Sequence, residues 1–258
     1  MLTYEDFVLK ICQLTGIDLS LYKEKQMKRR INSLILNSNY KNYDDYYKAL
    51  TTNKNLYNEF INYITINVTE FFRNLDQWIV LENEILPYLI KKNLKIWSAA
   101  CSTGEEPYTL AMILSKHINL EDVNIIATDI DENALAKAQK GIYTDKSLEK
   151  VPAEYIKKFF TKVNNTSYII SETLRKNIIF KKHNLLTDKY PENVNLVICR
   201  NVLIYFNDKA KNDTYKKIYD CLSNDGIFFV GGTEQIILPY RYNFEPIKTF
   251  FYKKISNN

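Results

Sequence analysis

The stretch that predicts the fold is Lys95-Ile-Trp-Ser-Ala-Ala-Cys-Ser-Thr-Gly-Glu-Glu-Pro-Tyr108. It begins as a short apolar run and continues as a polar loop that leads into a helical pattern. Short apolar runs are typical of strands buried on both faces of a parallel sheet. Ligands of such sheets bind in the loops that follow the strands' carboxyl ends. The stretch therefore predicts an α/β fold with its first candidate binding loop at residues 98–108.

Further apolar runs follow and alternate with segments of helical spacing. The runs cover residues 124–129, 177–181, 195–199 and 226–230, and the helical segments cover residues 107–118, 132–140 and 209–221. This alternation predicts a doubly wound, Rossmann-like sheet with right-handed crossovers. Residues 244–255 are expected to add antiparallel edge strands.

Two regions depart from that alternation. Apolar residues recur at helical spacing from Tyr4 to about Asp76, which predicts a small all-helical N-terminal domain at residues 1–76. The α/β domain is expected at residues 77–258. A small antiparallel β subdomain is predicted as an insertion at about residues 155–183, with residues 168–171 and 177–180 as candidate paired strands.

Composition narrows the class of protein. The 258 residues are 46% hydrophobic and 25% charged, with a net charge of +5. The four cysteines form no Cys-x-x-Cys pair, which favours reduced thiols and a cytoplasmic protein. The N-terminus does not resemble a secretory signal, and no stretch reaches the roughly 20 apolar residues of a membrane span. Two histidines are too few for a His-rich site, so no metal is expected.

The first loop excludes two common phosphate-binding motifs. It contains a single glycine, Gly104, so both the Gly-x-Gly-x-x-Gly fingerprint and the Walker lysine loop are missing. The adjacent carboxylates of Glu105 and Glu106 would repel phosphate but could accept hydrogen bonds from an ammonium group, such as that of S-adenosylmethionine. A capping box formed by Thr103 and Glu106 explains the same residues equally well.

Two other strand ends carry polar residues. Asp129 ends the second strand, where a carboxylate can accept hydrogen bonds from the hydroxyls of a ribose, and Asp131 suits the N-cap of the next helix. The strand at residues 195–199 leads into Arg200-Asn201, with Tyr205 one turn later. Methyltransferases acting on nucleobases tend to carry an Asp/Asn-Pro-Pro-Tyr/Phe motif at this position, and this chain has none.

Taken together, these motifs resemble those of the CheR methyltransferases, in the same order and over the full length of the chain. The motifs are Asn67-Val-Thr-Glu-Phe-Phe-Arg73, Trp97-Ser-Ala-Ala-Cys-Ser-Thr-Gly-Glu-Glu-Pro-Tyr108, Thr128-Asp-Ile-Asp131, Gly141-Ile-Tyr143, His183-Asn-Leu185 and Cys199-Arg-Asn-Val-Leu-Ile-Tyr-Phe206. One departure is Gly231-Gly232-Thr233-Glu234, where the family usually has Gly-His-Ser-Glu. The lost histidine puts local packing near the site in doubt.

The resemblance implies an activity and a set of site residues. The enzyme would transfer a methyl group from S-adenosylmethionine to glutamate side chains of chemoreceptors, leaving S-adenosylhomocysteine. Arg73 and Tyr205 would face the methyl-transfer site. The residues expected to contact the cofactor are Asn67, Thr69, Arg73, Glu106, Asp129, Asn184, Leu185, Arg200 and Asn201.

A basic segment at residues 21–36 is the candidate docking site for the substrate. Its apolar residues share one helical face, and its basic residues lie opposite or on the flanks. The basic residues are Lys25, Lys28, Arg29 and Arg30. Such a charge run is usually only a solvated face, but acidic receptor helices would be attracted to it. We expect the cytoplasmic helices of chemoreceptors as partners, a monomeric enzyme, and neither nucleic acid nor membrane insertion.

The loop at residues 161–167 is short and lacks glycine. Family members that bind a receptor-tail pentapeptide carry a longer, glycine-bearing loop there, so the resemblance implies no such tether for this chain.

Two alternative functions remain open at this point. The net charge is compatible with a nucleic-acid methyltransferase, whose methyl groups would be stable to alkali, unlike glutamyl methyl esters. A non-catalytic module that senses S-adenosylmethionine would bind the cofactor without transferring its methyl group.

Overall fold

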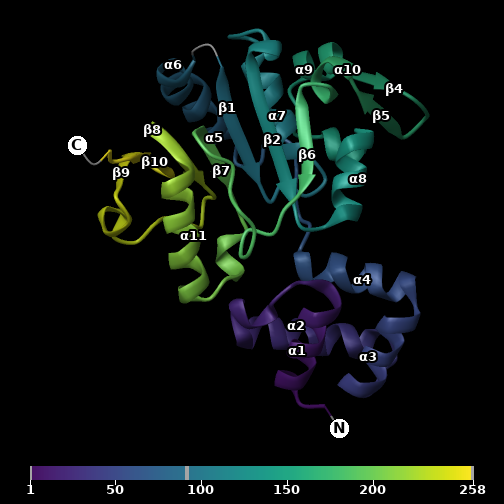
Figure 1. Cartoon of the computed structure of the whole chain (residues 1–258). Coiled ribbons are helices and arrows are strands. Elements are labelled where there is room, and N and C mark those ends of the chain that lie inside the picture. Colours follow the sequence, from purple (N-terminus) through teal and green to yellow (C-terminus); the bar gives the residue numbers. More distant parts are fainter. Residues whose placement is uncertain (1, 91–92, 257–258) are drawn as a thin grey trace. The chain divides into compact units, whose positions relative to one another are not determined.

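The computed structural model describes residues 2–90 and 93–256 and separates into two compact units (Figure 1). Unit 1 comprises residues 1–67 and 202–214, and unit 2 comprises residues 68–201 and 215–258. In the described part of the chain, no helix combines the length and apolar character needed to span a membrane.

Unit 1 is helical, as its apolar spacing predicts. Thr3 and Asp6 form a reciprocal capping box at the start of the first helix, and Gly16 ends that helix in the left-handed conformation. Phe7, Tyr46 and Phe60 are fully buried and pack edge to face or tilted in the core. The helices are α1 (Tyr4–Thr15), η1 (Leu19–Leu21), α2 (Glu24–Asn37), α3 (Tyr43–Thr52), α4 (Lys54–Thr65) and η5 (Leu203–Tyr205).

Unit 2 is built on a 7-stranded sheet of order β6-β2-β1-β7-β8-β10-β9. The strands from β6 to β8 pair in parallel, and β10 and β9 are antiparallel additions, as expected for residues 244–255. The order reverses between β1 and β7, which makes this the topological switch point. The strands are β1 (Leu94–Ala99), β2 (Val123–Asp129), β6 (Ile178–Lys182), β7 (Val194–Cys199), β8 (Leu222–Val230), β9 (Phe244–Lys248) and β10 (Phe251–Lys254).

A separate 3-stranded antiparallel sheet, of order β3-β5-β4, forms the predicted small β subdomain. Its strands are β3 (Ile142–Thr144), β4 (Phe160–Lys162) and β5 (Ser167–Ile170). The expected pairing of residues 168–171 with 177–180 is wrong. β5 pairs with β3 and β4, whereas β6 pairs in parallel with β2. The short helix α10 (Glu172–Arg175) separates β5 from β6 and lets the chain leave one sheet for the other.

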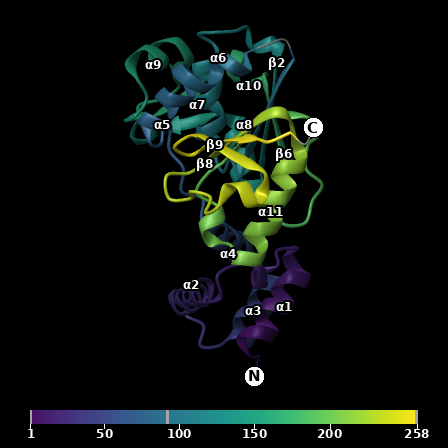
Figure 2. The same cartoon turned by 90° about the vertical axis from the view of Figure 1, so that its left-hand side faces the viewer.

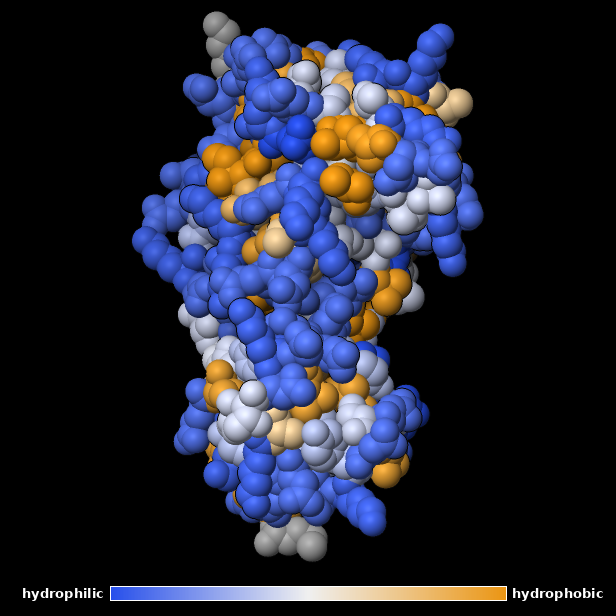
Figure 3. All heavy atoms as spheres, turned by 90° about the vertical axis from the view of Figure 1, so that its right-hand side faces the viewer, coloured by the Kyte–Doolittle hydropathy of each residue, from blue (hydrophilic) through white to orange (hydrophobic). Residues whose placement is uncertain are grey.

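Helices cover both faces of the large sheet: α11 (Asp208–Cys221) lies in front of it and α7 (Glu105–Leu114) behind it in Figure 1, and Figure 2 shows the same arrangement from the side. Trp78, Trp97 and Phe229 are among the fully buried residues of this unit. The face shown in Figure 3 is mostly hydrophilic, with apolar atoms in separate patches. The remaining helices are α5 (Leu75–Val80), a π-helical turn (Leu81–Ile85), α6 (Leu86–Leu89), α7 (Glu105–Leu114), η3 (Leu120–Asp122), α8 (Glu132–Lys140), η4 (Asp145–Leu148), α9 (Ala153–Phe159), α10 (Glu172–Arg175), α11 (Asp208–Cys221) and η6 (Pro239–Tyr242).

The turn from β1 into α7 depends on one glycine. Gly104 is the N-cap of α7 and has φ 97°, a conformation that L side chains rarely adopt. A Cβ atom there would lie 2.8 Å from the Cβ of Ala138 on α8. Gly104 therefore allows both the sharp turn and the close approach of α8.

We expect Gly104→Ala to destabilise the protein by about 3 kcal/mol, since it adds overpacking to left-handed strain. Gly16→Ala is the matched control, because φ is 74° there and nothing lies within 4 Å of the added Cβ. Its cost should be about 1 kcal/mol. Urea unfolding followed by circular dichroism measures both losses, and equal losses would contradict the packing argument.

Candidate functional site

Three strand ends of unit 2 meet at the switch point of the sheet. β1 pairs with β2 on one side and with β7 on the other, so Ala99 lies beside both Thr128 and Cys199. The predicted site residues lie at or just after these strand ends: Asp129 ends β2, Arg200 and Asn201 follow β7, and Glu106 lies in the first turn of α7 after the loop that leaves β1. The topology thus brings these loops to one edge of the sheet.

Asp129 holds the loop after β1 in place. Its Oδ2 accepts a hydrogen bond from the backbone N–H of Ser102 at 2.7 Å, and its Oδ1 accepts one from the N–H of Asp131 at 2.9 Å. The backbone N–H of Cys101 donates to the carbonyl of Thr128 at 2.8 Å. These bonds support a loop in which Ala100 and Ser102 both have positive φ.

The two aspartates after β2 have different surroundings. Asp131 is the N-cap of α8, as predicted, and its carboxylate accepts hydrogen bonds from the N–H groups of Asn133 and Ala134. Asp129 is buried, and that burial raises its pKa from 3.8 to about 6 against the opposing effect of its backbone hydrogen bonds.

The capping-box interpretation of Thr103 and Glu106 is wrong. The N-cap of α7 is Gly104, and the hydroxyl of Thr103 donates instead to the carboxylate of Glu105 at 2.7 Å. The carboxylate of Glu106 accepts hydrogen bonds from two side chains near strand ends of unit 2, from Ser98 Oγ at 2.8 Å and from Arg200 Nη1 at 3.4 Å. Burial raises the pKa of Glu106, and the charge of Arg200 opposes that rise.

Arg200 is a buried cation with partners from three segments of the chain. Besides Glu106, its Nη2 donates to the carbonyl of Arg73 and to Gln77 Oε1, both at 2.8 Å. Its guanidinium carbon lies 5.3 Å from the ring centre of Trp78 and 4.9 Å from that of Phe229. Its Nε is buried and has no hydrogen-bond partner among the residues that the structure describes.

The segment that precedes α5 carries Thr69 and Arg73. The carbonyl of Arg73 accepts from Arg200 and also from Trp78 Nε1 at 3.1 Å. Its guanidinium donates to the carbonyl of Val68 at 2.8 Å, at an exposed position. The backbone of Arg73 is therefore fixed to the core, while its side chain lies at the surface of unit 2. Thr69 is half-buried.

Asn184 and Leu185 lie in a compact turn after β6. Asn184 Oδ1 accepts from the N–H of Leu186 at 2.9 Å, and the carbonyl of Leu185 accepts from the hydroxyl of Tyr190 at 2.8 Å. The preceding residue, His183, donates its backbone N–H to the carbonyl of Asp129 at 2.9 Å. This bond links the third loop to the one that carries the buried aspartate.

Glu234 is a site residue that was not predicted. Its carboxylate accepts hydrogen bonds from the backbone N–H groups of Gly231 and Asn201. Asn201 has φ 61°, and the bond from its N–H helps hold it in that conformation. The family-like motif at residues 231–234 marks this region in the sequence, but its spacing does not reveal the contact between Glu234 and Asn201. Gln77 had no signal in the sequence at all.

The other predicted residues belong to unit 1. The side-chain amide of Asn67 donates to Asn62 Oδ1 at 2.9 Å and to Thr65 Oγ1 at 3.1 Å. Tyr205 is half-buried, and its carbonyl accepts from the backbone N–H of Lys23 at 2.8 Å.

The basic residues of α2 fall into two classes. Lys25 and Arg29 are exposed, opposite the buried face formed by Met27, Ile31, Leu34 and Ile35. Lys28 instead lies 4.0 Å from the carboxylate of Glu5 and over the ring of Tyr4. Arg30 donates to the carbonyl of Tyr63 and lies over its ring.

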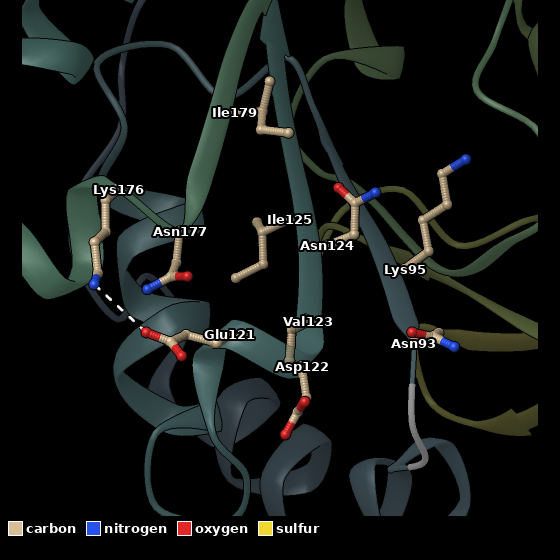
Figure 4. A pocket seen from close by; sticks show the side chains of 10 residues that line it. All are labelled: Asn93, Lys95, Glu121, Asp122, Val123, Asn124, Ile125, Lys176, Asn177 and Ile179. Atoms are coloured by element: carbon tan, nitrogen blue, oxygen red, sulfur yellow. Dashed lines mark ion pairs between the residues drawn. The ribbon is translucent and has the colours of Figure 1, made fainter.

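A pocket at the opposite edge of the sheet is not the candidate site. It lies where β1, β2 and β6 begin, and an ion pair of 3.5 Å between Lys176 and Glu121 lies beside it (Figure 4). Ligands of doubly wound sheets bind at the carboxyl ends of the strands, not at these amino ends.

Within residues 2–90 and 93–256, no group of three His, Cys, Asp or Glu residues could hold a metal ion.

Comparison with known proteins identifies the family. The model described as "CheR methyltransferase, SAM binding domain" matches residues 67–251, and "CheR methyltransferase, all-alpha domain" matches residues 2–65. The chain belongs to the CheR methyltransferase family. It is 42% identical to a "Chemotaxis protein methyltransferase" of Listeria innocua over 93% of this chain and 92% of that protein. A protein of the same name from Borreliella burgdorferi is 36% identical over 93% and 89% of the two chains.

This CheR protein is a methyltransferase whose cofactor is S-adenosylmethionine, and the residues of unit 2 fit that molecule. The Nε of Arg200 is a buried donor without an acceptor, which suits the carboxylate of the cofactor's methionyl group. Asp129 presents a buried carboxylate at the end of β2, where ribose hydroxyls are expected to donate. The described geometry thus offers acceptors and a donor of the required kinds.

The raised pKa of Asp129 makes stability depend on pH. Because the folded-state pKa is the higher one, the stabilisation from this carboxyl is complete below about 3.8 and is lost as pH rises through about 6. From about pH 5 to about pH 7, wild-type CheR should therefore lose about 1 kcal/mol relative to Asp129→Asn. Urea unfolding across this range measures the difference, with the exposed Asp122→Asn as control. Parallel curves for wild type and Asp129→Asn would contradict the burial argument.

Proposed function

We propose that this CheR methyltransferase transfers methyl groups to glutamate side chains on the cytoplasmic helices of chemoreceptors. The observation that carries the proposal is the family membership. In addition, Arg200-Asn201 follows β7 at the position where nucleobase methyltransferases tend to have a Pro-Pro-aromatic motif, which argues against a nucleobase as the methyl acceptor. The names of the relatives point to the same process. That this enzyme acts as a monomer and needs no receptor-tail peptide remains a prediction.

We propose that the cofactor is bound by the residues that match the family's motifs. In unit 2, Arg200 Nε would bind the methionyl carboxylate and Asp129 the ribose, while Glu106 would contact the cofactor and also keep the Arg200 side chain in place. The other proposed contacts are Asn67, Thr69, Arg73, Asn184, Leu185 and Asn201. S-adenosylmethionine supplies a methyl group on a sulfonium, which is already a good leaving group.

The chain's own residues have to position the acceptor. A glutamate carboxylate is ionised at neutral pH, so no general base is needed. Alignment alone can supply roughly 7–11 kcal/mol in well-oriented reactions. In this proposal Arg73 attracts the substrate carboxylate by charge-assisted hydrogen bonds, and the hydroxyl of Tyr205 orients the attacking oxygen. Exclusion of water would favour the step in which opposite charges neutralise each other.

The activity is tested by incubating the full chain with methyl-labelled S-adenosylmethionine and a chemoreceptor cytoplasmic fragment. Label should enter the receptor and be released as methanol in base. Tyr205→Phe should lower turnover by about tenfold or more, because it removes only the orienting hydroxyl. Tyr88→Phe, at an exposed tyrosine, is the control. Base-stable label, label in nucleic acid, or cofactor binding without transfer would each reject the proposal.

Receptor docking is assigned to Lys25 and Arg29, the exposed cations of α2. Opposite surface charges raise encounter rates, and salt screens them beyond about 8 Å at physiological ionic strength. Lys25→Glu/Arg29→Glu should raise KM for the receptor several-fold at low salt and flatten its salt dependence, leaving cofactor affinity unchanged. Lys28 and Arg30 contribute less, because each already interacts within unit 1.

The matched control is Lys48→Glu/Lys54→Glu, which makes the same change in net charge at exposed positions of α3 and α4. If both double variants change KM equally, only net charge matters. If neither changes it, α2 serves only as scaffold.

A further inference from the structure

The side chain of Gln77 is buried beside the Arg200 cation although no motif includes it. Gln77 lies on α5 and is 7% exposed. Its Oε1 accepts a hydrogen bond of 2.8 Å from Arg200 Nη2, the nitrogen that also donates to the carbonyl of Arg73. Asn74 Oδ1 accepts a third, longer bond of 3.3 Å from the same nitrogen. Gln77 thus lies on the side of the guanidinium away from its bond to Glu106.

The space for the Gln77 amide comes from the absence of a side chain at Gly232. A Cβ atom at Gly232 would lie 3.1 Å from Gln77 Nε2, which is tighter than ordinary van der Waals contact. φ at Gly232 does not lie in the left-handed range, so its backbone does not require glycine. A side chain at position 232 would therefore press on the amide of Gln77, and with glycine there the amide occupies this space.

The orientation of Arg200 decides which of its nitrogens remains available. Nη1 is engaged with Glu106, and Nη2 with Gln77 and the Arg73 carbonyl, so Nε is the buried donor left without a partner. The neighbouring rings of Trp78 and Phe229 lie near the guanidinium but supply no oxygen or nitrogen acceptor for its N–H groups. A rotated guanidinium would offer a different nitrogen to a ligand and remove one of the two hydrogen bonds that the Arg73 carbonyl accepts.

We propose that Gln77, in the space left by Gly232, is the positioning residue that orients Arg200 so that its Nε meets the cofactor carboxylate and its Nη2 fixes the backbone of Arg73. This inference rests on the roles given to Arg200 and Arg73 under the proposed function. Gln77 touches neither cofactor nor substrate in this scheme and acts only through Arg200.

The test measures binding of S-adenosylhomocysteine by calorimetry, which needs no methyl acceptor. Gln77→Leu keeps much of the side chain's shape but removes the acceptor, and it should weaken binding about tenfold, as expected for one lost hydrogen bond to a charged group. Gln77→Glu retains an acceptor oxygen and should bind within about twofold of wild type. Gln139→Leu, at an exposed glutamine of α8, is the control.

A second variant reaches the same contact from the other side. Gly232→Val should displace the amide and weaken binding by a similar factor. The double variant Gln77→Leu/Gly232→Val should be no weaker than the poorer single variant, because both remove one interaction. With a receptor fragment as acceptor, Gln77→Leu should also lower kcat, because a rotated Arg200 leaves the Arg73 carbonyl with its hydrogen bond from Trp78 Nε1 alone.

The outcomes separate the inference from the proposed function. Wild-type affinity in Gln77→Leu, or a lowered melting temperature with unchanged affinity, would overturn the positioning role and leave only packing. Failure of Gln77→Glu to restore binding would overturn it too. If wild type methylates no receptor but Gln77→Leu still weakens binding and Gln77→Glu restores it, the proposed substrate is wrong and the orientation of Arg200 by Gln77 stands.

Discussion

The guanidinium of Arg200 is buried beside the rings of Trp78 and Phe229, which also contact each other, and a charge in that position must be matched by acceptors from the surrounding chain. The acceptors come from α7, through Glu106, and from the segment at residues 73–77. Removing one partner would leave part of a buried charge uncompensated. The cost of burying Arg200 therefore fixes the relative positions of α7, the start of α5 and the end of β7.

A second constraint acts through the backbone. Asp129 accepts two backbone N–H groups, and Glu234 accepts two more, so each carboxylate holds a turn that contains a positive φ. Such conformations cost about 1–3 kcal/mol each and persist only where neighbouring groups enforce them. The strand-end loops are thus held by buried acids, and burial keeps the pKa of Asp129 above its ordinary value.

Much of this arrangement could be predicted from the sequence. The apolar runs predicted the parallel strands, because strands buried on both faces contain few polar residues. The preference of helix N-caps for aspartate predicted Asp131 as the N-cap of α8. The pairing of β6 was harder, since a short apolar run fits either sheet and only long-range packing decides between them. Thr103 satisfied the capping-box spacing, yet Gly104 took the N-cap position because the turn required positive φ.

The missed site residues show where sequence reasoning ends. Gln77 and Glu234 act through contacts with Arg200 and Asn201, which are distant in the chain, and neither spacing nor composition signals such contacts. The same contacts bear on the chemistry. Glu106, Asp129 and Glu234 all accept hydrogen bonds from the chain, so each carboxylate helps to hold the site together. A general base would have to be free to take a proton, whereas transfer from a sulfonium to an ionised carboxylate requires only alignment. A site whose acids serve as structural acceptors is therefore suited to an acceptor that is already deprotonated.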